Sequence, residues 1–151
     1  MAGSNDIRID RATGADAGAM LALMERAQLP TDGLESHLEA AFVARRGDRV
    51  VGSAAIEIYA DGGLLRSVAV DVECRGTGLG GRLASAAIDE AQRRRLPALY
   101  LLTTTAEDFF PRFGFERITR DEVPASVQES IEFRGACPAS AVVMLKRLST
   151  Q

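Results

Sequence analysis

The stretch Arg75-Gly76-Thr77-Gly78-Leu79-Gly80-Gly81-Arg82 decides the fold, because half of it is glycine and it separates two patterned runs. Residues 64–70 before it are largely apolar and predict a strand. Residues 83–95 after it carry apolar side chains at helical spacing. A glycine-rich turn between a strand and a helix leaves backbone N–H groups unpaired at the positive end of the helix dipole. Such a concavity suits an anion, most often a phosphate, so the stretch predicts a site for a phosphate-bearing ligand.

The length and charge of the chain narrow the class of protein. Its 151 residues predict a single domain over residues 1–151 with a substantial core. The formal net charge of −3 argues against a nucleic-acid partner, since such proteins usually present a basic face. No apolar run approaches the roughly 20 residues that cross a bilayer, and residues 1–10 lack the apolar core of a signal peptide. We therefore expect a cytoplasmic protein without a membrane partner.

The residue types that bind metals are sparse. Cys74 and Cys137 lie far apart and form no C-x-x-C pair, and His37 is the single histidine. This pattern predicts neither a disulfide framework nor a zinc site, so we expect no metal. His37 falls within a short predicted helix, where a solvated position is the commoner outcome.

The rest of the chain alternates strand and helix patterns without an internal repeat or linker. Two apolar runs flank Arg46-Gly47-Asp48-Arg49 and predict a β-hairpin. The strands on either side of the helix at residues 83–95 are expected to be parallel, because a crossover helix packs back onto the same sheet. The prediction is an α+β fold, in which helices flank a mixed but mostly antiparallel sheet. The expected strands are residues 7–12, 42–45, 50–59, 64–72, 98–103, 115–118 and 141–145, and the expected helices follow Thr13 and cover residues 34–41, 83–95, part of 104–113 and 123–130.

Two known phosphate-binding motifs fit the glycine turn poorly. Gly76-x-Gly78-x-x-Gly81 has the spacing of the dinucleotide fingerprint, which requires an acidic residue about 20 positions later. Residues 96–102 contain none. A mononucleotide P-loop needs a lysine after its last glycine, and no lysine lies near this turn. A turn without a ligand remains an alternative.

The segment Val70-Asp71-Val72-Glu73-Cys74-Arg75-Gly76-Thr77-Gly78-Leu79-Gly80 resembles the signature of the GNAT-type N-acetyltransferases. Residues 106–115, a short aromatic helix ending in Gly-Phe, resemble a later motif of that superfamily. The resemblance implies a six- to seven-stranded GNAT-like fold and acetyl-CoA as co-substrate. The turn would hold the pyrophosphate, the preceding strand edge would pair with the pantetheine arm, and one amide there would stabilise the thioester oxyanion. The cofactor-binding residues so implied are Val68, Ala69, Val70, Arg75, Gly76, Thr77, Gly78, Leu79, Gly80, Phe109, Phe110 and Arg112.

Further segments resemble one branch of that superfamily. Residues 65–70, Thr103-Thr104-Thr105 and residues 109–115 resemble the amino-acid acetyltransferases. The tail, residues 123–144, resembles small acetyltransferases found with arsenic-resistance genes. The resemblance implies a small amino acid or amino-acid-like amine as acceptor, and a homodimer, which is common among similar proteins.

Acetylation requires a neutral amine, so an ammonium group must first lose a proton. Glu57, on a neighbouring strand, is the candidate base, although a solvent-facing carboxylate is an equal alternative. The sequence departs from the family pattern twice, with Phe110 where many relatives have a tyrosine acid and Leu64 where amino-acid acetylating relatives often have glutamate. No dedicated acid is one alternative, because a thiolate with a pKa near 8.5 leaves without help. The candidate relays to the thiolate are Thr103, Thr105, Ser130 and Cys137.

An arginine is the expected partner of a substrate carboxylate, because its fork matches two oxygens. Strand alternation predicts Arg66 on the face of Val68 and Val70, beside Ser67, and Arg45 is the second candidate. A surface charge is the alternative for each. The candidate substrate-binding residues are Arg45, Arg66, Ser67, Ser130 and Cys137.

Two functions follow from this sequence. The first is transfer of an acetyl group from acetyl-CoA to a small amine. The second is a catalytically weak protein of the same fold that binds or senses acyl-CoA, an interpretation that the departures at Leu64 and Phe110 favour slightly.

Overall fold

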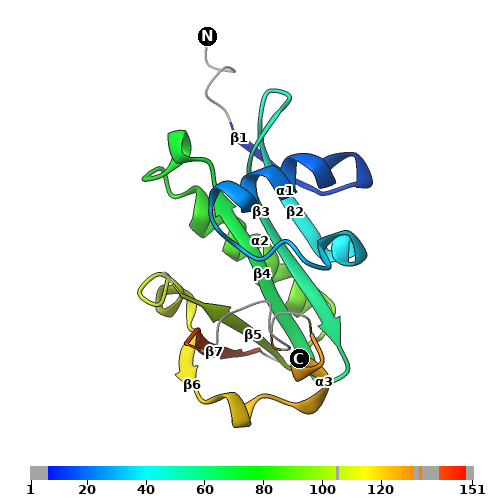
Figure 1. The fold of residues 1–151 in the computed structure, drawn as a ribbon, viewed down its shortest axis with the longest axis vertical. Coiled ribbons are helices and arrows are strands. Elements are labelled where there is room, and N and C mark those ends of the chain that lie inside the picture. The colour runs from blue at the N-terminus through cyan, green and yellow to red at the C-terminus, as the bar shows by residue number, and fades with distance from the viewer. Residues whose placement is uncertain (1–6, 105, 131–132, 134–139, 149–151) are drawn as a thin grey trace.

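A computed structural model of the chain describes residues 7–104, 106–130, 133 and 140–148. Within these residues one seven-stranded mixed sheet forms the centre of the molecule, with the strand order β1-β2-β3-β4-β5-β7-β6 (Figure 1). This architecture confirms the predicted α+β fold. The strands are β1 (Ile7–Arg11), β2 (Ala41–Arg46), β3 (Arg49–Tyr59), β4 (Gly62–Val70), β5 (Ala98–Thr103), β6 (Glu116–Ile118) and β7 (Val142–Arg147).

Helices lie on both faces of the sheet. The two long ones are α1 (Ala17–Arg26) and α2 (Leu79–Arg93). In Figure 1, α1 crosses in front of the sheet and α2 lies behind it. No helix among the described residues is long and apolar enough to span a membrane. The short helices are η2 (Gly14–Asp16), η3 (Leu34–Ala40), η4 (Val72–Cys74), η5 (Phe110–Phe113), η6 (Arg120–Glu122) and α3 (Ala125–Gln128).

The predicted pairing of the strands is confirmed. Arg46 pairs with Arg49 across the turn Gly47-Asp48, so β2 and β3 form the expected hairpin. Strand β5 is parallel to β4, as a crossover through α2 requires. The two strands pair only at Gly63–Leu99 and Leu64–Tyr100, and beyond these pairs they diverge. This divergence leaves the later part of β4 with an open edge beside β5.

The helix α2 begins four residues earlier than expected. Gly78 caps it with a left-handed φ of 82°, so the glycines at 80 and 81 already lie in its first turn. Its predicted apolar face is buried against β2, β3 and β4. A β-carbon on Gly52 of β3 would lie 2.7 Å from Leu83 Cδ1, which shows how closely α2 approaches the sheet.

A β-bulge in β4 reverses one prediction. Ser67 and Val68 both lie opposite Ala54, between the pairs Ala55–Arg66 and Ser53–Ala69. Ser67 is the extra residue of the bulge, and its backbone has a φ of 61°. The bulge shifts the alternation of side chains by one residue. Val68 and Val70 therefore pack on the α2 face with Leu65, whereas Arg66 lies on the α1 face beside its partner Ala55. The prediction that Arg66 shares the face of Val68 and Val70 is wrong, because simple alternation holds only in an unbulged strand.

Three shorter elements also differ from expectation. The aromatic helix is the single 3-10 turn η5, which ends at Gly114 with a φ of 93°. The helix expected over residues 123–130 is the four-residue α3, and β4 ends at Val70, two residues early. Asp71 ends this strand by accepting a hydrogen bond from the N–H of Glu73, which starts η4.

Candidate active site

The glycine turn after η4 has the open geometry that the sequence predicts. Gly76 and Gly78 have φ values of 81° and 82°, a conformation that side chains with a β-carbon rarely adopt. The N–H of Arg75 donates to the carbonyl of Val72 at 3.4 Å, and the hydroxyl of Thr77 donates to the carbonyl of Cys74 at 2.5 Å. Among the described residues, no backbone carbonyl accepts from the N–H groups of residues 76–80. These groups lie at the N-terminus of the 15-residue helix α2, which makes the turn an anion-binding concavity.

Asp71 fixes the chain where it enters this turn. Its carboxylate accepts from the N–H of Glu73 at 3.1 Å and from Arg49 Nη2 at 2.8 Å, and Arg26 lies 3.8 Å away. These interactions lower the pKa of Asp71, with the backbone hydrogen bond from Glu73 as the largest cause. The backbone N–H of Asp71 also donates to the carbonyl of Val51. The start of the turn is therefore bound to both the hairpin and α1.

A cavity of about 530 Å³ lies where β4 and β5 diverge. Val68, Val70 and Gly80 line it on the α2 face, whereas Arg66 lines it on the α1 face together with residues 28–30. The cavity therefore reaches from one face of the sheet to the other through the gap between the strands. Its lining residues are Gln28, Leu29, Pro30, Leu65, Arg66, Ser67, Val68, Val70, Gly80, Leu101, Leu102, Thr103, Thr104, Ala106, Phe109 and Phe110.

The predicted cofactor residues divide into a cavity group and a turn group. Val68, Val70, Gly80, Phe109 and Phe110 line the cavity. A β-carbon on Gly80 would lie 3.4 Å from the ring of Phe109, so glycine lets that ring approach the start of α2. The remaining predicted residues lie outside the cavity lining: residues 75–78 are exposed in the turn, Ala69 and Leu79 are buried, and Arg112 is exposed on η5.

Phe110 has no hydroxyl but has a clear packing role. Its ring meets Phe115 edge-on at 5.7 Å and Phe109 edge-on at 5.0 Å. Phe109 and Phe110 of this aromatic cluster line the cavity.

Glu57 and Arg66 form a buried ion pair beside the cavity. Arg66 Nη1 donates to Glu57 Oε2 at 2.6 Å, and their side chains are 0% and 2% exposed. The other oxygen of Glu57 accepts from the hydroxyl of Tyr59 and lies 3.7 Å from His37 Nε2. Arg66 lines the cavity, whereas Glu57 does not. The structure thus brings the predicted base and the predicted carboxylate partner into contact with each other.

His37 is half-buried in η3 near Glu57, where the sequence favours a solvated position. The difference arises because η3 packs against β3, which carries Glu57 and Tyr59. The ring of His37 lies 6.5 Å from that of Tyr59.

The remaining predicted site residues lie at different distances from the cavity. Thr103 lines it, and its Oγ1 accepts from the N–H of Ala106 at 2.9 Å. Ser67 lines it through the bulge. Ser130 is buried outside the lining, where its hydroxyl accepts from the N–H of Phe133. Thr105 and Cys137 fall outside the described residues.

Arg45 lies away from the cavity. It donates to Asp16 at 2.8 and 2.9 Å and to Asp10 at 3.0 Å, and the hydrogen bonds from Arg45 are the largest cause of the lowered pKa of Asp16. Because Thr13 and Asp16 form the capping box that precedes α1, Arg45 fixes the start of that helix.

Sequence reasoning missed the segment that follows α1. Gln28, Leu29 and Pro30 line the cavity, as does Thr104. Residues 29–33 contain proline and glycine and indicate only the end of a helix. Nothing local to that segment places it against β4. Among the described residues, no three histidine, cysteine or acidic side chains are grouped to hold a metal ion.

Comparison with known proteins places the chain in a family. Residues 37–117, more than half of the chain, match the family described as acetyltransferase (GNAT) domain. The chain belongs to this GNAT acetyltransferase family.

Two amino-acid acetyltransferases of Neisseria meningitidis are 26% identical to the chain over 117 residues. The match covers 76% of this chain and 26% of each relative, so the chain spans about a quarter of the length of these curated relatives.

Solved structures agree on the fold. N-acetylglutamate synthase from Neisseria gonorrhoeae, complexed with coenzyme A and N-acetyl-glutamate, has a TM-score of 0.81 at 24% identity, covering 95% of this chain and 35% of that one. The Mycobacterium tuberculosis protein Rv2747, in complex with CoA and NLQ, has a TM-score of 0.79 at 25% identity, covering 94% of this chain and 99% of that one.

Proposed function

We propose that this protein transfers an acetyl group from acetyl-CoA to the amine of a small amino acid or amino-acid-like compound. The observation that carries the proposal is the set of open N–H groups at residues 76–80, next to a cavity that runs between β4 and β5. The family match and the coenzyme A named in two similar structures support it.

Each part of the cofactor site has a physical role in this proposal. The N–H groups of residues 76–80 donate to the pyrophosphate, and the dipole of α2 favours its charge. The open edge of β4 at residues 68–70 offers backbone hydrogen bonds to the amides of the pantetheine arm. Acetyl-CoA supplies a thioester as the acetyl donor. A backbone N–H of the β4 bulge is suited to stabilise the oxyanion that develops on the thioester carbonyl.

The acceptor amine reaches the thioester from the α1 face, where Arg66 and Ser67 meet residues 28–30. Its nitrogen forms the new C–N bond as the C–S bond breaks, and the amine proton leaves to water. Glu57 is less suited to act as the base than the sequence predicts, because Arg66 and Tyr59 occupy its oxygens.

Thr103 is the candidate donor to the departing thiolate. Its oxygen already accepts the N–H of Ala106, so its own proton points elsewhere, and the residue lines the cavity. The relay roles predicted for Thr105, Ser130 and Cys137 stay predictions, as do the cytoplasmic location, the homodimer and the link to arsenic resistance.

A thiol-release assay tests this function. We expect thiol release that depends on both acetyl-CoA and an acceptor, in a panel that begins with glutamate and its phosphorus- and arsenic-bearing analogues. Gly78→Val should lower the affinity for coenzyme A at least a hundredfold, because its backbone is left-handed. Gly18→Val is the matched control, since Gly18 has open space around it in α1 and no positive φ. Normal coenzyme A affinity in Gly78→Val would contradict the proposed site.

The second candidate function is binding of acyl-CoA without turnover. The absence of a hydroxyl at Phe110, on the wall of the cavity, favours it. Thermal stabilisation by acetyl-CoA without thiol release from any member of the panel would support this alternative over the enzyme.

A further inference from the structure

Arg66 of β4 binds the segment that follows α1. Arg66 Nη1 donates to the carbonyl of Asp32 at 2.6 Å, and Arg66 Nη2 donates to the carbonyl of Pro30 at 3.1 Å. In Figure 1 this segment crosses in front of β4, which carries Arg66. Its residues 28–30 form the cavity wall on the α1 face. The guanidinium of Arg66 therefore connects β4 to this wall of the cavity.

The same guanidinium is held from two other directions. Its Nε donates to the hydroxyl of Ser67 at 3.0 Å, which connects it to the β4 bulge. Its Nη1 donates to Glu57, whose second oxygen accepts from Tyr59. Both charged side chains are sealed from solvent, so neither exchanges these partners for bulk water. Glu57 and Tyr59 fix the direction in which Arg66 points.

This arrangement differs from that of a guanidinium awaiting a substrate carboxylate. Each nitrogen of Arg66 already donates within the protein. A carboxylate that bound Arg66 through a fork would displace the carbonyl of Pro30 or Asp32 and so release the wall. The charge of Arg66 is also offset by Glu57.

We propose that Arg66 is a positioning residue that holds residues 28–32 and thereby the acceptor wall at residues 28–30, and that Glu57 and Tyr59 hold Arg66 in place. That this wall faces the acceptor rests on the proposed function, whereas the attachment of the wall to Arg66 does not. The wall in turn sets the width of the entrance on the α1 face. Loss of the attachment therefore weakens acceptor binding and leaves the coenzyme A site intact, because the turn at residues 75–78 lies outside the cavity lining and is fixed by Asp71.

Amide hydrogen exchange of the full chain without ligands tests the attachment directly. Arg66→Lys keeps the charge but loses the fork, and Glu57→Gln keeps the shape but loses the charge. We expect exchange at residues 28–33 to rise at least tenfold in both variants, with residues 75–82 unchanged. Tyr59→Phe, which removes one hydroxyl, should raise the same exchange about threefold and keeps the test available if the other two variants fold poorly.

Arg11→Lys and Glu90→Gln are matched controls, because they alter another buried glutamate and its arginine, which join α2 to β1. They should leave exchange at residues 28–33 unchanged. Unchanged exchange there in Arg66→Lys or in Tyr59→Phe would overturn the proposal. So would a rise in wild-type exchange on addition of an acceptor, since that result would assign Arg66 to the carboxylate instead.

A kinetic readout separates this proposal from the proposed function. In Arg66→Lys we expect the fold increase of the acceptor KM to be about ten times the fold decrease of kcat. The Kd of coenzyme A should stay within twofold of wild type. A fall in kcat alone would contradict the positioning role. If no acceptor is turned over at all, the proposed enzyme fails, while the exchange and coenzyme A measurements still decide the attachment.

Discussion

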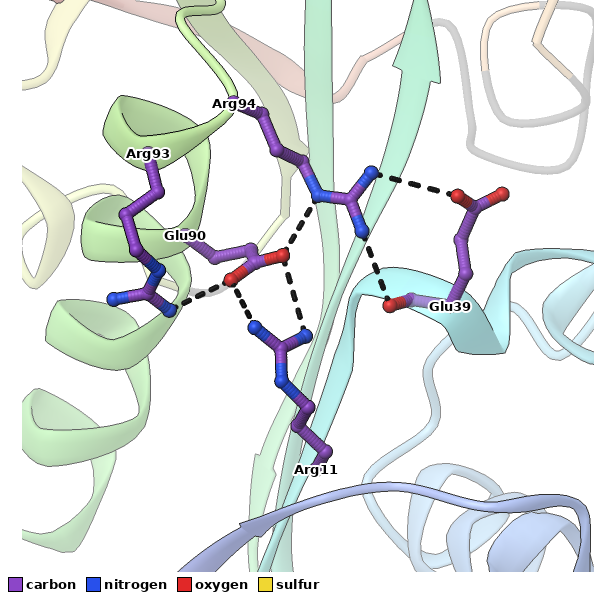
Figure 2. A network of polar contacts seen from close by, with 5 residues as sticks. All are labelled: Arg11, Glu39, Glu90, Arg93 and Arg94. Atoms are coloured by element: carbon purple, nitrogen blue, oxygen red, sulfur yellow. Dashed lines mark hydrogen bonds and ion pairs between the residues drawn. The ribbon is translucent and has the colours of Figure 1, made fainter.

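Two buried glutamates of this protein, Glu57 and Glu90, are both paired with arginine but in different surroundings. Glu90 of α2 accepts from Arg11 at 2.5 and 3.2 Å, from Arg93 at 2.6 Å and from Arg94 at 2.7 Å (Figure 2). Arg94 also reaches Glu39 of η3. This cluster connects β1, α2 and η3 into one scaffold.

The difference lies in the exposure of the arginines. The side chains of Arg11, Arg93 and Arg94 are 53%, 59% and 32% exposed, whereas that of Arg66 is 0% exposed. Arginines at the surface can exchange a lost carboxylate for water, but a sealed one cannot. The burial of a glutamate therefore does not by itself reveal its importance. The solvent access of its arginine partner is the better guide. The pair with no solvent access, Glu57 and Arg66, is the one beside the cavity.

The largest effect is expected from Glu57→Ala, which leaves Arg66 charged and sealed. Removal of one partner of a buried ion pair costs about 3–5 kcal/mol of stability. Urea unfolding at neutral pH measures this loss. A loss below about 1 kcal/mol would mean that water reaches Arg66, and the contrast between the two glutamates would fail.

Glu90→Ala should cost less, although Glu90 has more arginine partners. The side chains of its three arginine partners are 32% to 59% exposed. Ion pairs with such solvent access contribute roughly 0.2–1 kcal/mol each. We expect a total of about 1–2 kcal/mol in the same unfolding experiment, with coenzyme A affinity unchanged. A loss equal to that of Glu57→Ala would show that partner exposure does not govern the cost.

Acid should remove the contribution of Glu90 selectively. The hydrogen bond from Arg11 is the largest cause that lowers the pKa of Glu90 from 4.5 to about 2. Because the folded-state pKa is below the unfolded value, the stabilisation is complete above about pH 4.5 and is lost as the pH falls towards 2. Melting temperatures of wild type and Glu90→Gln should therefore converge over this range. A constant difference between them down to pH 2.5 would contradict the lowered pKa.

The smallest effect concerns the bulge that brings Arg66 to its face. Glycine usually destabilises a strand relative to alanine, but Ser67 has a φ of 61°. Ser67→Gly should therefore be more stable than Ser67→Ala by about 0.5–1 kcal/mol. At Ser53, which pairs regularly with Ala69, the same two substitutions should rank in the opposite order. Thermal unfolding of the four variants checks both signs.

Prediction from sequence succeeded where the signal was local. The hairpin at residues 46–49, the apolar face of α2 and the glycine turn each depend on residues adjacent in the chain, and each is found as expected. The face of Arg66 was predicted wrongly because the bulge depends on the register between β3 and β4. The wall at residues 28–30 could not be predicted, since its attachment to Arg66 joins residues 34 and 36 positions apart.

The sequence by itself determined the fold class and the open turn before α2. Helical and strand periodicity act over a few residues, and only glycine adopts the backbone of Gly76 and Gly78 freely. The tertiary structure alone decided that Glu57 pairs with Arg66 and that residues 28–30 line one side of the cavity. The physical reason is that buried charges and carbonyl groups need hydrogen-bond partners. These partners come from segments far apart in the sequence, so no local pattern predicts them.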